Sequence, residues 1–306
     1  MIWYRFLQTQ ESSSTRIRLA ESMAHIYEEI DPDLVAELET GNKSSAVGGS
    51  STPSIWDSLS ELPRTLLEMS ALSATWPLLS SAPRGDGHTV FVMPGFMAGD
   101  RSTLALRRFI DRQNLNSISW ELGQNNGSFD QQDELLRRFE QVMASTSGAI
   151  SLVGQSLGGV YARLLANHWP ERIRQVITLG SPFASPGPDT VNATVSRLFQ
   201  YMSGMSEDEM RDQMLGLSGP LRVPATAIFS RSDGVVHWTS CIDGPGHRSE
   251  NVEILGSHSG MGFNPTVLYV IADRLAQAAD NWRPFNRRGC LKGLVFPAST
   301  TQTRLS

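Results

Sequence analysis

A serine set among glycines is the first group in this sequence that could do chemistry. Ser156 lies in the run GQSLGG at 154–159, which fits the pattern G-x-S-x-G with one further glycine. The run follows an apolar stretch at 150–153 and opens a predicted helix at 157–168. Such a strand–turn–helix holds a serine hydroxyl at the helix N-terminus, where the helix dipole favours developing negative charge. The pattern therefore predicts a nucleophile, and the alternative is a capping serine in a plain glycine-rich turn.

A serine hydroxyl is a poor nucleophile until a base accepts its proton. Of the six histidines, His258 is the best placed, because it follows the last predicted strand, 252–255. Loops that leave the carboxyl ends of strands are where open α/β sheets gather their sites. His88 precedes a strand and so belongs to the opposite edge, while His237 and His247 stay open as alternatives.

The base in turn needs an acid that fixes its tautomer and stabilises the imidazolium. Asp233 comes directly after the penultimate predicted strand, 226–229, and is the expected acid. The order along the chain is then nucleophile, acid, base, as in α/β hydrolases. Asp189 is the main alternative acid and Asp243 a weaker one.

Backbone N–H groups should stabilise the oxyanion that forms when a serine attacks a carbonyl. One donor should be the amide of Leu157, directly after the nucleophile. The other should come from the turn after the strand at 90–93, where Phe96 is the first choice and Met97 the second. A plain strand-ending turn is the alternative.

The elements that must position these groups alternate between strand and helix from residue 88 onward. Short apolar runs predict strands at 90–93, 116–120, 149–153, 176–179, 226–229 and 252–255. Apolar residues at helical spacing predict helices at 101–113, capped by Asp100 or Ser102, and at 130–145, 157–168 and 265–278. This alternation predicts an α/β fold with a mostly parallel sheet and helices on both faces.

The organisation expected around this core has three further parts. Residues 1–87 predict a helical N-terminal extension, with an amphipathic helix at 16–30 and a helical segment at 54–73 that Pro63 should break or kink. Residues 88–286 form the core, and 287–306 a C-terminal tail whose basic and apolar residues could touch a membrane surface. We expect a loosely docked or disordered tail, with contact to a membrane surface as the alternative.

Residues 183–222 are too long for an ordinary connection and predict a helical insertion, cap-like in position. Phe199, Met202 and Met205 lie in it, and such adaptable apolar side chains suit an acyl pocket or a lid. An equally favoured alternative is that the insertion forms a pair of helices packed on the core, with its methionines buried there.

Composition narrows the class of protein. The chain has 306 residues and a formal net charge of −5, which argues against nucleic-acid binding. Cys241 and Cys290 cannot build a disulfide scaffold, and we expect two free thiols. No apolar run approaches the roughly 18 residues of a membrane span, and no secretory signal is recognisable, so a soluble cytoplasmic protein is expected. Neither metal-ligand spacing nor G-x-G-x-x-G occurs, so no metal or organic cofactor is expected.

From about residue 89 to 285 the chain resembles bacterial serine esterases and lipases of the α/β-hydrolase superfamily. The supporting segments are VFVMPGF at 90–96, LVGQSLGG at 152–159, VITLGSP at 176–182 and SDGVV at 232–236. The resemblance implies ester hydrolysis through an acyl-enzyme, with Ser156 as nucleophile, His258 as base and Asp233 as acid. Family members often carry His-Gly where this chain has Pro94-Gly95, and a histidine where it has Gln155. Neither departure removes a catalytic group.

The function expected from the sequence is a serine carboxylic-ester hydrolase that acts on small-molecule esters with apolar acyl groups. An acyltransferase would form the same acyl-enzyme and pass it to an alcohol instead of water. A non-catalytic binding protein on the same scaffold is the rival from another class, because fold alone never establishes catalysis.

Overall fold

The computed structural model describes residues 52–184, 200, 217–244, 246, 248–287 and 296–297. They belong to a compact unit that runs from Ser50 to Ser306. The predicted helix at 16–30 and most of the predicted insertion lie outside the described residues. The predicted division into extension, core, insertion and tail therefore stays a prediction.

The sheet of this unit has six strands, and every neighbouring pair is parallel. Its spatial order is β2-β1-β3-β4-β5-β6. The strands are β1 Thr89–Met93, β2 Asn116–Ser119, β3 Ile150–Gln155, β4 Ile173–Leu179, β5 Ala225–Ser230 and β6 Ser249–Ile254. Each of the six expected strands is present, and only the ends differ from the sequence-based ranges.

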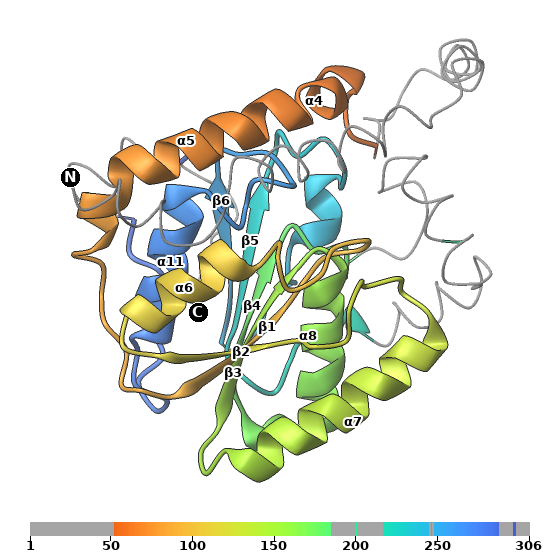
Figure 1. The fold of residues 1–306 in the computed structure, drawn as a ribbon, viewed down its shortest axis with the longest axis vertical. Coiled ribbons are helices and arrows are strands. Elements are labelled where there is room, and N and C mark those ends of the chain that lie inside the picture. Colours follow the sequence, from red (N-terminus) through yellow and green to blue (C-terminus); the bar gives the residue numbers. More distant parts are fainter. Residues whose placement is uncertain are drawn as a thin grey trace. The chain divides into compact units, whose positions relative to one another are not determined.

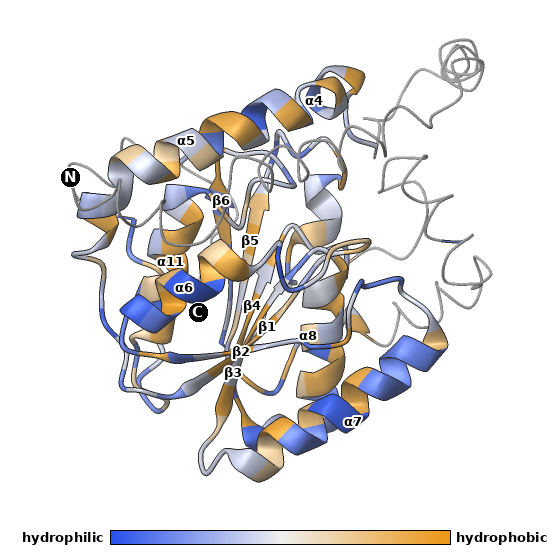
Figure 2. Ribbon diagram, viewed as in Figure 1, coloured by the Kyte–Doolittle hydropathy of each residue, from blue (hydrophilic) through white to orange (hydrophobic). Residues whose placement is uncertain are grey.

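Helices cover both faces of the sheet, as predicted (Figure 1). One face carries α5 (Glu61–Leu79), α6 (Leu104–Arg112) and α11 (Pro265–Leu275), and the other carries α7 (Phe129–Ser145) and α8 (Leu157–His168). Apolar residues dominate the inner strands β1, β4 and β5 and helix α11, whereas hydrophilic residues recur along α7 (Figure 2). Continuous apolar runs are what a parallel sheet buried on both faces requires.

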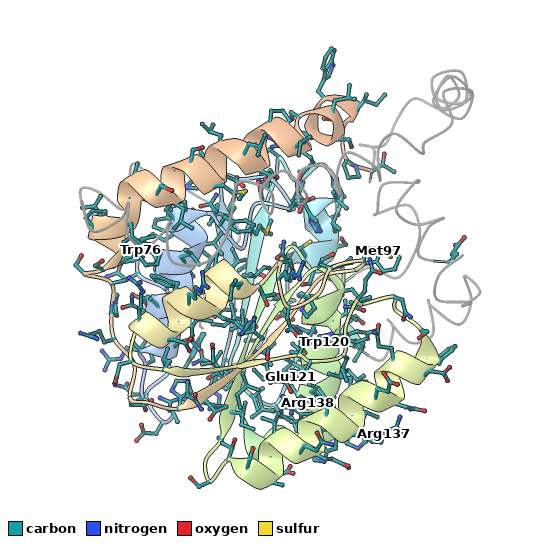
Figure 3. All side chains as sticks on the ribbon, viewed as in Figure 1. Trp76, Met97, Trp120, Glu121, Arg137 and Arg138 are labelled. Carbon is teal, nitrogen blue, oxygen red and sulfur yellow. The ribbon has the colours of Figure 1, made fainter. Side chains whose placement is uncertain are left out.

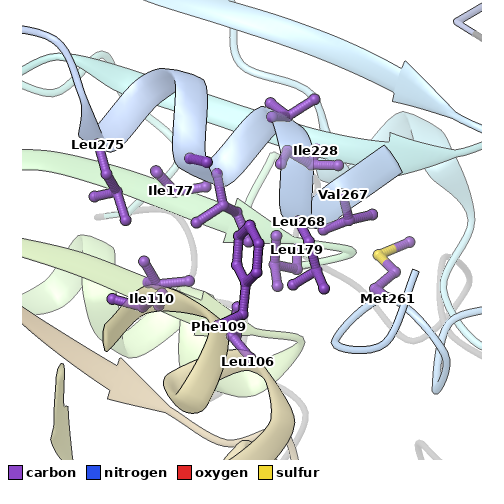
Figure 4. Packing of buried hydrophobic residues seen from close by; sticks show 14 of the residues in the cluster. Leu106, Phe109, Ile110, Ile177, Leu179, Ile228, Met261, Val267, Leu268 and Leu275 are labelled. Carbon is purple, nitrogen blue, oxygen red and sulfur yellow. The ribbon is translucent and has the colours of Figure 1, made fainter. Parts of the chain in front are cut away.

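The two layers of helices enclose two apolar cores. In the first, Phe109 of α6 lies among Ile177 of β4 and Leu268 of α11, all at most 1% exposed (Figure 4). Burying one such phenylalanine contributes roughly 2–3 kcal/mol. Trp76 of α5 packs edge-on against the Phe109 ring at 6.2 Å, which attaches α5 to this core (Figure 3).

Two details of the predicted helices are wrong. The segment at 54–73 breaks at Ser60, between α4 (Ile55–Leu59) and α5, and α5 continues to Leu79. Pro63 does not break it, because it stands in the first turn, where a backbone N–H has no intrahelical acceptor to lose.

The second error concerns the start of α6. Thr103, not Asp100 or Ser102, is its N-cap. Asp100 instead accepts hydrogen bonds from the backbone N–H groups of Trp120 and Glu121, both at 3.0 Å. Its carboxylate thereby ties the loop after β1 to the end of β2.

The first half of helix α5 has the reverse of the usual surface-helix pattern, whereas its second half packs Trp76 and Leu79 against the apolar core. Its buried face carries Glu61, Thr65 and Glu68. The exposed side chains of α4 and α5 include large apolar residues, namely Ile55, Trp56, Leu59, Leu66, Leu67 and Leu78. Between residues 52 and 80, no exposed side chain is charged.

In the described part of the chain, no helix is long and apolar enough to cross a membrane. Two residues of the predicted tail are placed against the core. Phe296 is 6% exposed and packs against the ring of Phe285 at 5.0 Å. Arg287 donates to the backbone oxygen of Asn251. Membrane contact by the tail stays an untested expectation.

Candidate active site

Ser156 occupies a strained turn between β3 and α8. Its backbone has φ +51° and ψ −122°, a region that a residue with a side chain rarely adopts. The flanking glycines make the turn possible: a Cβ on Gly154 would lie 2.1 Å from the oxygen of Gly158, and one on Gly158 would lie 2.5 Å from that of Met93. Strain of this kind, of order 1–3 kcal/mol, tends to occur at functional sites. The turn leaves the Ser156 side chain half-buried rather than enclosed.

His258 and Asp233 form a buried hydrogen-bonded pair. The Nδ1 atom of His258 lies 2.7 Å from Oδ2 of Asp233, and the two residues are 6% and 3% exposed. The other oxygen of Asp233 accepts from the N–H groups of Val235 and Val236 at 2.9 and 2.8 Å. An ionised carboxylate only accepts, so it fixes the proton on Nδ1 and leaves Nε2 free to act as base.

The surroundings of His258 favour its charged form. Burial by itself would lower the pKa of this imidazole. The charge of Asp233, the hydrogen bond to it and the charge of Glu61 outweigh burial and raise the pKa above its ordinary value. A base with a raised pKa accepts the serine proton more readily once it is neutral.

Strand β4 and the glycine after it bring Ser156 next to this pair. The backbone N–H of Ser156 donates to the oxygen of Leu179 at 2.8 Å. The next residue, Gly180, has φ +55°, and a Cβ there would lie 3.1 Å from both Asp233 Oδ2 and His258 Nδ1. Gln155 also donates to the backbone oxygen of His258 at 3.1 Å. The expected nucleophile, acid and base are therefore gathered at one edge of the sheet.

The loop after β1 lies beside the serine, as the oxyanion prediction requires. A Cβ on Gly95 would lie 3.2 Å from the Cβ of Ser156. Leu157 is the first residue of α8, so its N–H has no intrahelical acceptor. The second choice, Met97, is unsuitable because its N–H donates to the backbone oxygen of Asn125 at 2.7 Å. Phe96 remains the proposed second donor, next to Met97 at the tip of this loop (Figure 3).

The competing acids and bases are engaged elsewhere or lie outside the described residues. Asp243 pairs with the fully buried Arg163 at 2.9 Å. His237 contacts the hydroxyl of Thr239 at 2.8 Å. Asp189 and His247 are outside the described residues, as are the predicted substrate-binding residues Phe199, Met202 and Met205.

A second Ser-His-Asp arrangement occurs at the opposite edge of the sheet. His88 contacts Asp86 at 2.6 Å through Nδ1 and the hydroxyl of Ser151 at 2.8 Å through Nε2. Ser151 lies inside β3 and is 0% exposed, so no substrate can reach it. Asp86 also pairs with Arg174 at 2.8 Å, and burial lowers the pKa of His88. Hydrogen-bond distances alone therefore do not single out a candidate active site, whereas solvent access and the glycine turn favour Ser156 over Ser151.

Sequence reasoning missed two residues of the site. Asn125 is fully buried and donates to the backbone oxygen of Pro94 at 2.9 Å, and its backbone bonds to Met97 and Ala98, so it holds the loop after β1 on both sides of the turn. Glu61 of α5 accepts from the backbone of His258 at 2.9 Å. Neither residue belongs to a motif, because each acts through backbone groups far away in the sequence.

In the described part of the chain, no group of three or more potential metal-ligating side chains is present. The cysteine prediction is tested only for Cys241, which is buried and free. Burial raises the pKa of its thiol well above the ordinary value. Cys290 lies outside the described residues.

Comparison with known proteins gives one family match. The family described as PGAP1-like alpha/beta domain matches residues 130–223, which is less than a third of the chain. No curated protein is similar in sequence at a significant level.

Solved structures with a similar arrangement include several proteins titled as hydrolases. A thioesterase domain from the curacin biosynthetic pathway is 14% identical, with 65% of this chain and 92% of that chain covered and a TM-score of 0.44. A pyrethroid hydrolase from Sphingobium faniae JZ-2 is 14% identical, with 64% of this chain and 100% of that chain covered and a TM-score of 0.44. Alpha/beta hydrolase domain-containing protein 10 from mouse is 15% identical, with 62% of this chain and 88% of that chain covered and a TM-score of 0.44. At these identities and scores, the three likenesses carry no inference about the activity of this chain.

The chain's own topology identifies its fold. The sheet is parallel, helices cover both faces, and a strained serine stands between β3 and α8. The acid and the base candidates follow β5 and β6, in that chain order. This combination is the α/β-hydrolase fold.

Proposed function

We propose that this chain is a serine hydrolase that cleaves carboxylic esters through an acyl-enzyme. The observation that carries the proposal is the His258–Asp233 pair, at 2.7 Å, gathered with a serine held in a strained glycine turn. A helix-capping serine would need neither the strain nor a paired histidine. The PGAP1-like match over 130–223 is compatible with this proposal, since it spans the turn.

The proposed reaction starts with attack of Ser156 Oγ on the ester carbonyl carbon, while Nε2 of His258 takes the hydroxyl proton. The carbonyl oxygen becomes an oxyanion, which the N–H groups of Leu157 and Phe96 stabilise. His258 then gives the proton to the leaving alcohol, and the acyl group stays on Ser156. Water, activated by the same histidine, releases the carboxylic acid and restores the serine.

Asp233 has the electrostatic role in this scheme. Its carboxylate holds the imidazole in the required tautomer and stabilises the imidazolium that forms in each step. The two backbone N–H groups that donate to its other oxygen hold the carboxylate in place. The proposed steps use only side chains and backbone groups of the chain itself.

The nature of the acyl group is the finer part of the proposal. We infer an apolar acyl chain from the methionine and aromatic side chains of the insertion, among them Phe199, Met202 and Met205. A neutral apolar pocket contributes about 0.8 kcal/mol per buried methylene, so kcat/KM should rise about fourfold per added CH₂ until the pocket is full.

A fluorophosphonate probe tests the reaction class, because it reacts with an activated serine. Intact-mass and peptide analysis should place a single adduct on Ser156, and the Ser156→Ala variant should take none. A wild-type chain that takes no adduct would exclude the proposal and favour a binding protein on this scaffold.

A series of p-nitrophenyl esters from acetyl to decanoyl tests the acyl preference. Met205→Gln and Phe199→Asn should flatten the rise of kcat/KM with chain length and spare the acetyl ester. An unchanged slope in both variants would mean that the insertion does not hold the acyl chain. Adding an acceptor alcohol would reveal acyl transfer as a second product.

A further inference from the structure

Helix α5 turns two carboxylates toward the loops that carry the base and the acid. Glu61 and Glu68 are 3% and 9% exposed, and seven residues separate them, so they lie on one face of the helix two turns apart. Figure 1 shows α5 crossing the end of the sheet where β5 and β6 stop. Buried carboxylates are costly unless they are paired, so their partners indicate what each one does.

Glu61 joins the two catalytic loops to each other. Its Oε1 accepts from the N–H of Gly234, next to the acid, at 2.8 Å, and from the N–H of His258 at 2.9 Å. Its Oε2 accepts from the N–H of Ser259 at 3.2 Å. Arg64, one turn along the helix, donates to Oε1 at 3.1 Å. One carboxylate thus fixes the backbone on both sides of the hydrogen-bonded pair.

Arg64 and Ser58 reinforce this link from the same part of the chain. Arg64 also donates to the backbone oxygen of Ser232 at 2.6 Å, just before the acid. The hydroxyl of Ser58 donates to the backbone oxygen of Gly234 at 2.6 Å. The acid loop is therefore held on both sides of Asp233 by residues 58–64.

Glu68 has a different set of partners and serves as a comparison. Its Oε1 accepts from the N–H of Ser257 at 2.7 Å, and its Oε2 from the hydroxyl of the same residue at 2.7 Å. Asn264 donates to it at 3.3 Å. Glu68 contacts the base loop and the start of α11 but not the acid loop.

We propose that Glu61 is a positioning residue for the His258–Asp233 pair, which keeps the two loops in register and places a second negative charge near the imidazole. The proposal rests on the hydrolase function proposed above. It makes helix α5 a part of the catalytic framework, although the helix precedes the sheet in the sequence.

The charged groups around His258 agree with this role. Asp233 faces its ring from the loop after β5, and Glu61 lies against its backbone from α5. Arg64 and Glu68 are the other charged side chains of α5 on this side, bound to Glu61 and to Ser257. The charge of Glu61 is among the causes that raise the pKa of His258.

The test compares Glu61→Gln with Glu68→Gln, which make the same chemical change on the same face of one helix. Glu61→Gln should lower kcat by about 10- to 100-fold with KM within about twofold, because a displacement near 1 Å at a reacting group has effects of this size. The acidic midpoint of the kcat/KM profile should fall by about 0.5–1 pH unit, since a nearby opposite charge has been removed. Glu68→Gln should lower kcat less and leave the midpoint in place.

Two outcomes would overturn the proposal. One is an unmoved midpoint in Glu61→Gln; the other is an equal change in both variants, which would mean that the two carboxylates only stabilise the fold. If Glu61→Gln does not fold, Glu61→Asp keeps the charge and shortens its reach, and kcat should fall several-fold at constant KM. Wild-type kcat in Glu61→Asp would then refute the positioning role.

A measurement without turnover separates this proposal from the proposed function. The pKa of His258 can be read by NMR from its ring nitrogens in wild type and in both glutamine variants. If the wild type hydrolysed no ester, the hydrolase proposal would fail, while a lowered His258 pKa in Glu61→Gln alone would still support the positioning role. The same pKa in all three proteins would refute it.

Discussion

Among the described residues, two serines lie near a histidine–aspartate pair, and they differ in their access to solvent. Ser156 is half-buried at the start of a helix, whereas Ser151 is enclosed within a strand. We predict that Ser156→Ala loses on the order of 10⁶ in kcat, by analogy with other triads. Ser151→Ala should change kcat less than threefold and cost about 1–2 kcal/mol of stability, because His88 loses a buried partner.

The p-nitrophenyl acetate assay and urea unfolding check both variants. If Ser151→Ala lost activity while its stability was unchanged, the nucleophile would be Ser151, at the amino edge of the sheet, and not Ser156.

The acid is the second prediction at the residue scale. Asp233→Asn should cost on the order of 10⁴ in kcat, because an amide that donates to Nδ1 stabilises the wrong tautomer of His258. Asp189→Asn should cost little, and Asp243→Asn should lower stability without reaching the chemistry, since that carboxylate pairs with Arg163. Steady-state kinetics on the three variants decide the matter: a severe loss in Asp189→Asn and a mild one in Asp233→Asn would reassign the acid.

The sheet and its helices could be predicted from the sequence because their signals are local. Short apolar runs indicate most of the strands, and the glycines that the turn at Ser156 requires are adjacent to it in the sequence. The contacts of α5 with the loops after β5 and β6 could not be predicted, because the inward face of its first half is polar and the partner residues follow more than 160 residues later. The contact of Asn125 with Pro94 could not be predicted either, because a side chain that binds a backbone group belongs to no sequence motif.

Helix α8 carries the third prediction, which concerns how the insertion is attached. Arg163 is fully buried, pairs with Asp243, and donates to the backbone oxygens of Leu217 and Gly219 at 2.8 and 2.6 Å. Phe183 lies under its guanidinium at 3.9 Å. These contacts hold the described ends of the insertion on α8. Arg163→Met should destabilise the fold by about 3–5 kcal/mol, because the buried Asp243 carboxyl loses its partner.

Arg231 provides a matched control for this arginine. It too pairs with a carboxylate, that of Glu253 at 3.2 Å, and stands 3.9 Å over an aromatic ring, but its side chain is 42% exposed. Arg231→Met should cost about 0–1 kcal/mol, as exposed ion pairs do. Urea unfolding of both variants gives the comparison, and equal losses would mean that the burial of the Arg163 pair does not matter.

Across the whole molecule, the sheet separates two edges with different tasks. The loops at the carboxyl ends of β1, β3, β5 and β6 carry the proposed oxyanion donor, nucleophile, acid and base. The amino edge carries the His88 cluster, in which Arg174 shares the exposed Asp86 with the histidine and Ser151 is enclosed. The same residue types thus support a proposed reaction at one edge and hold strands together at the other. The difference lies in solvent access and in which charge faces the imidazole.

Protonation of His258 should therefore have opposite effects on activity and stability: it should lower kcat/KM and stabilise the fold. The base must be neutral to accept the serine proton, so kcat/KM should rise with pH through a midpoint above the ordinary value of 6.5. The same raised pKa means that the charged pair stabilises the fold fully below pH 6.5, and that this stabilisation is lost as pH rises through the folded-state pKa. The slope is at most about 1.4 kcal/mol per pH unit for one proton.

Two measurements test this link. Urea unfolding of wild type and Asp233→Asn between pH 5 and 9 gives the pH dependence of stability, and the wild-type kcat/KM profile gives the pH dependence of activity. Asp233→Asn should be destabilised more at pH 5 than at pH 9, because it removes the partner of the charged imidazole. The pH at which this difference declines should coincide with the midpoint of the activity profile. Midpoints more than about one pH unit apart would mean that the proton controlling catalysis is not on His258, since a single titrating group has one pKa in the folded chain.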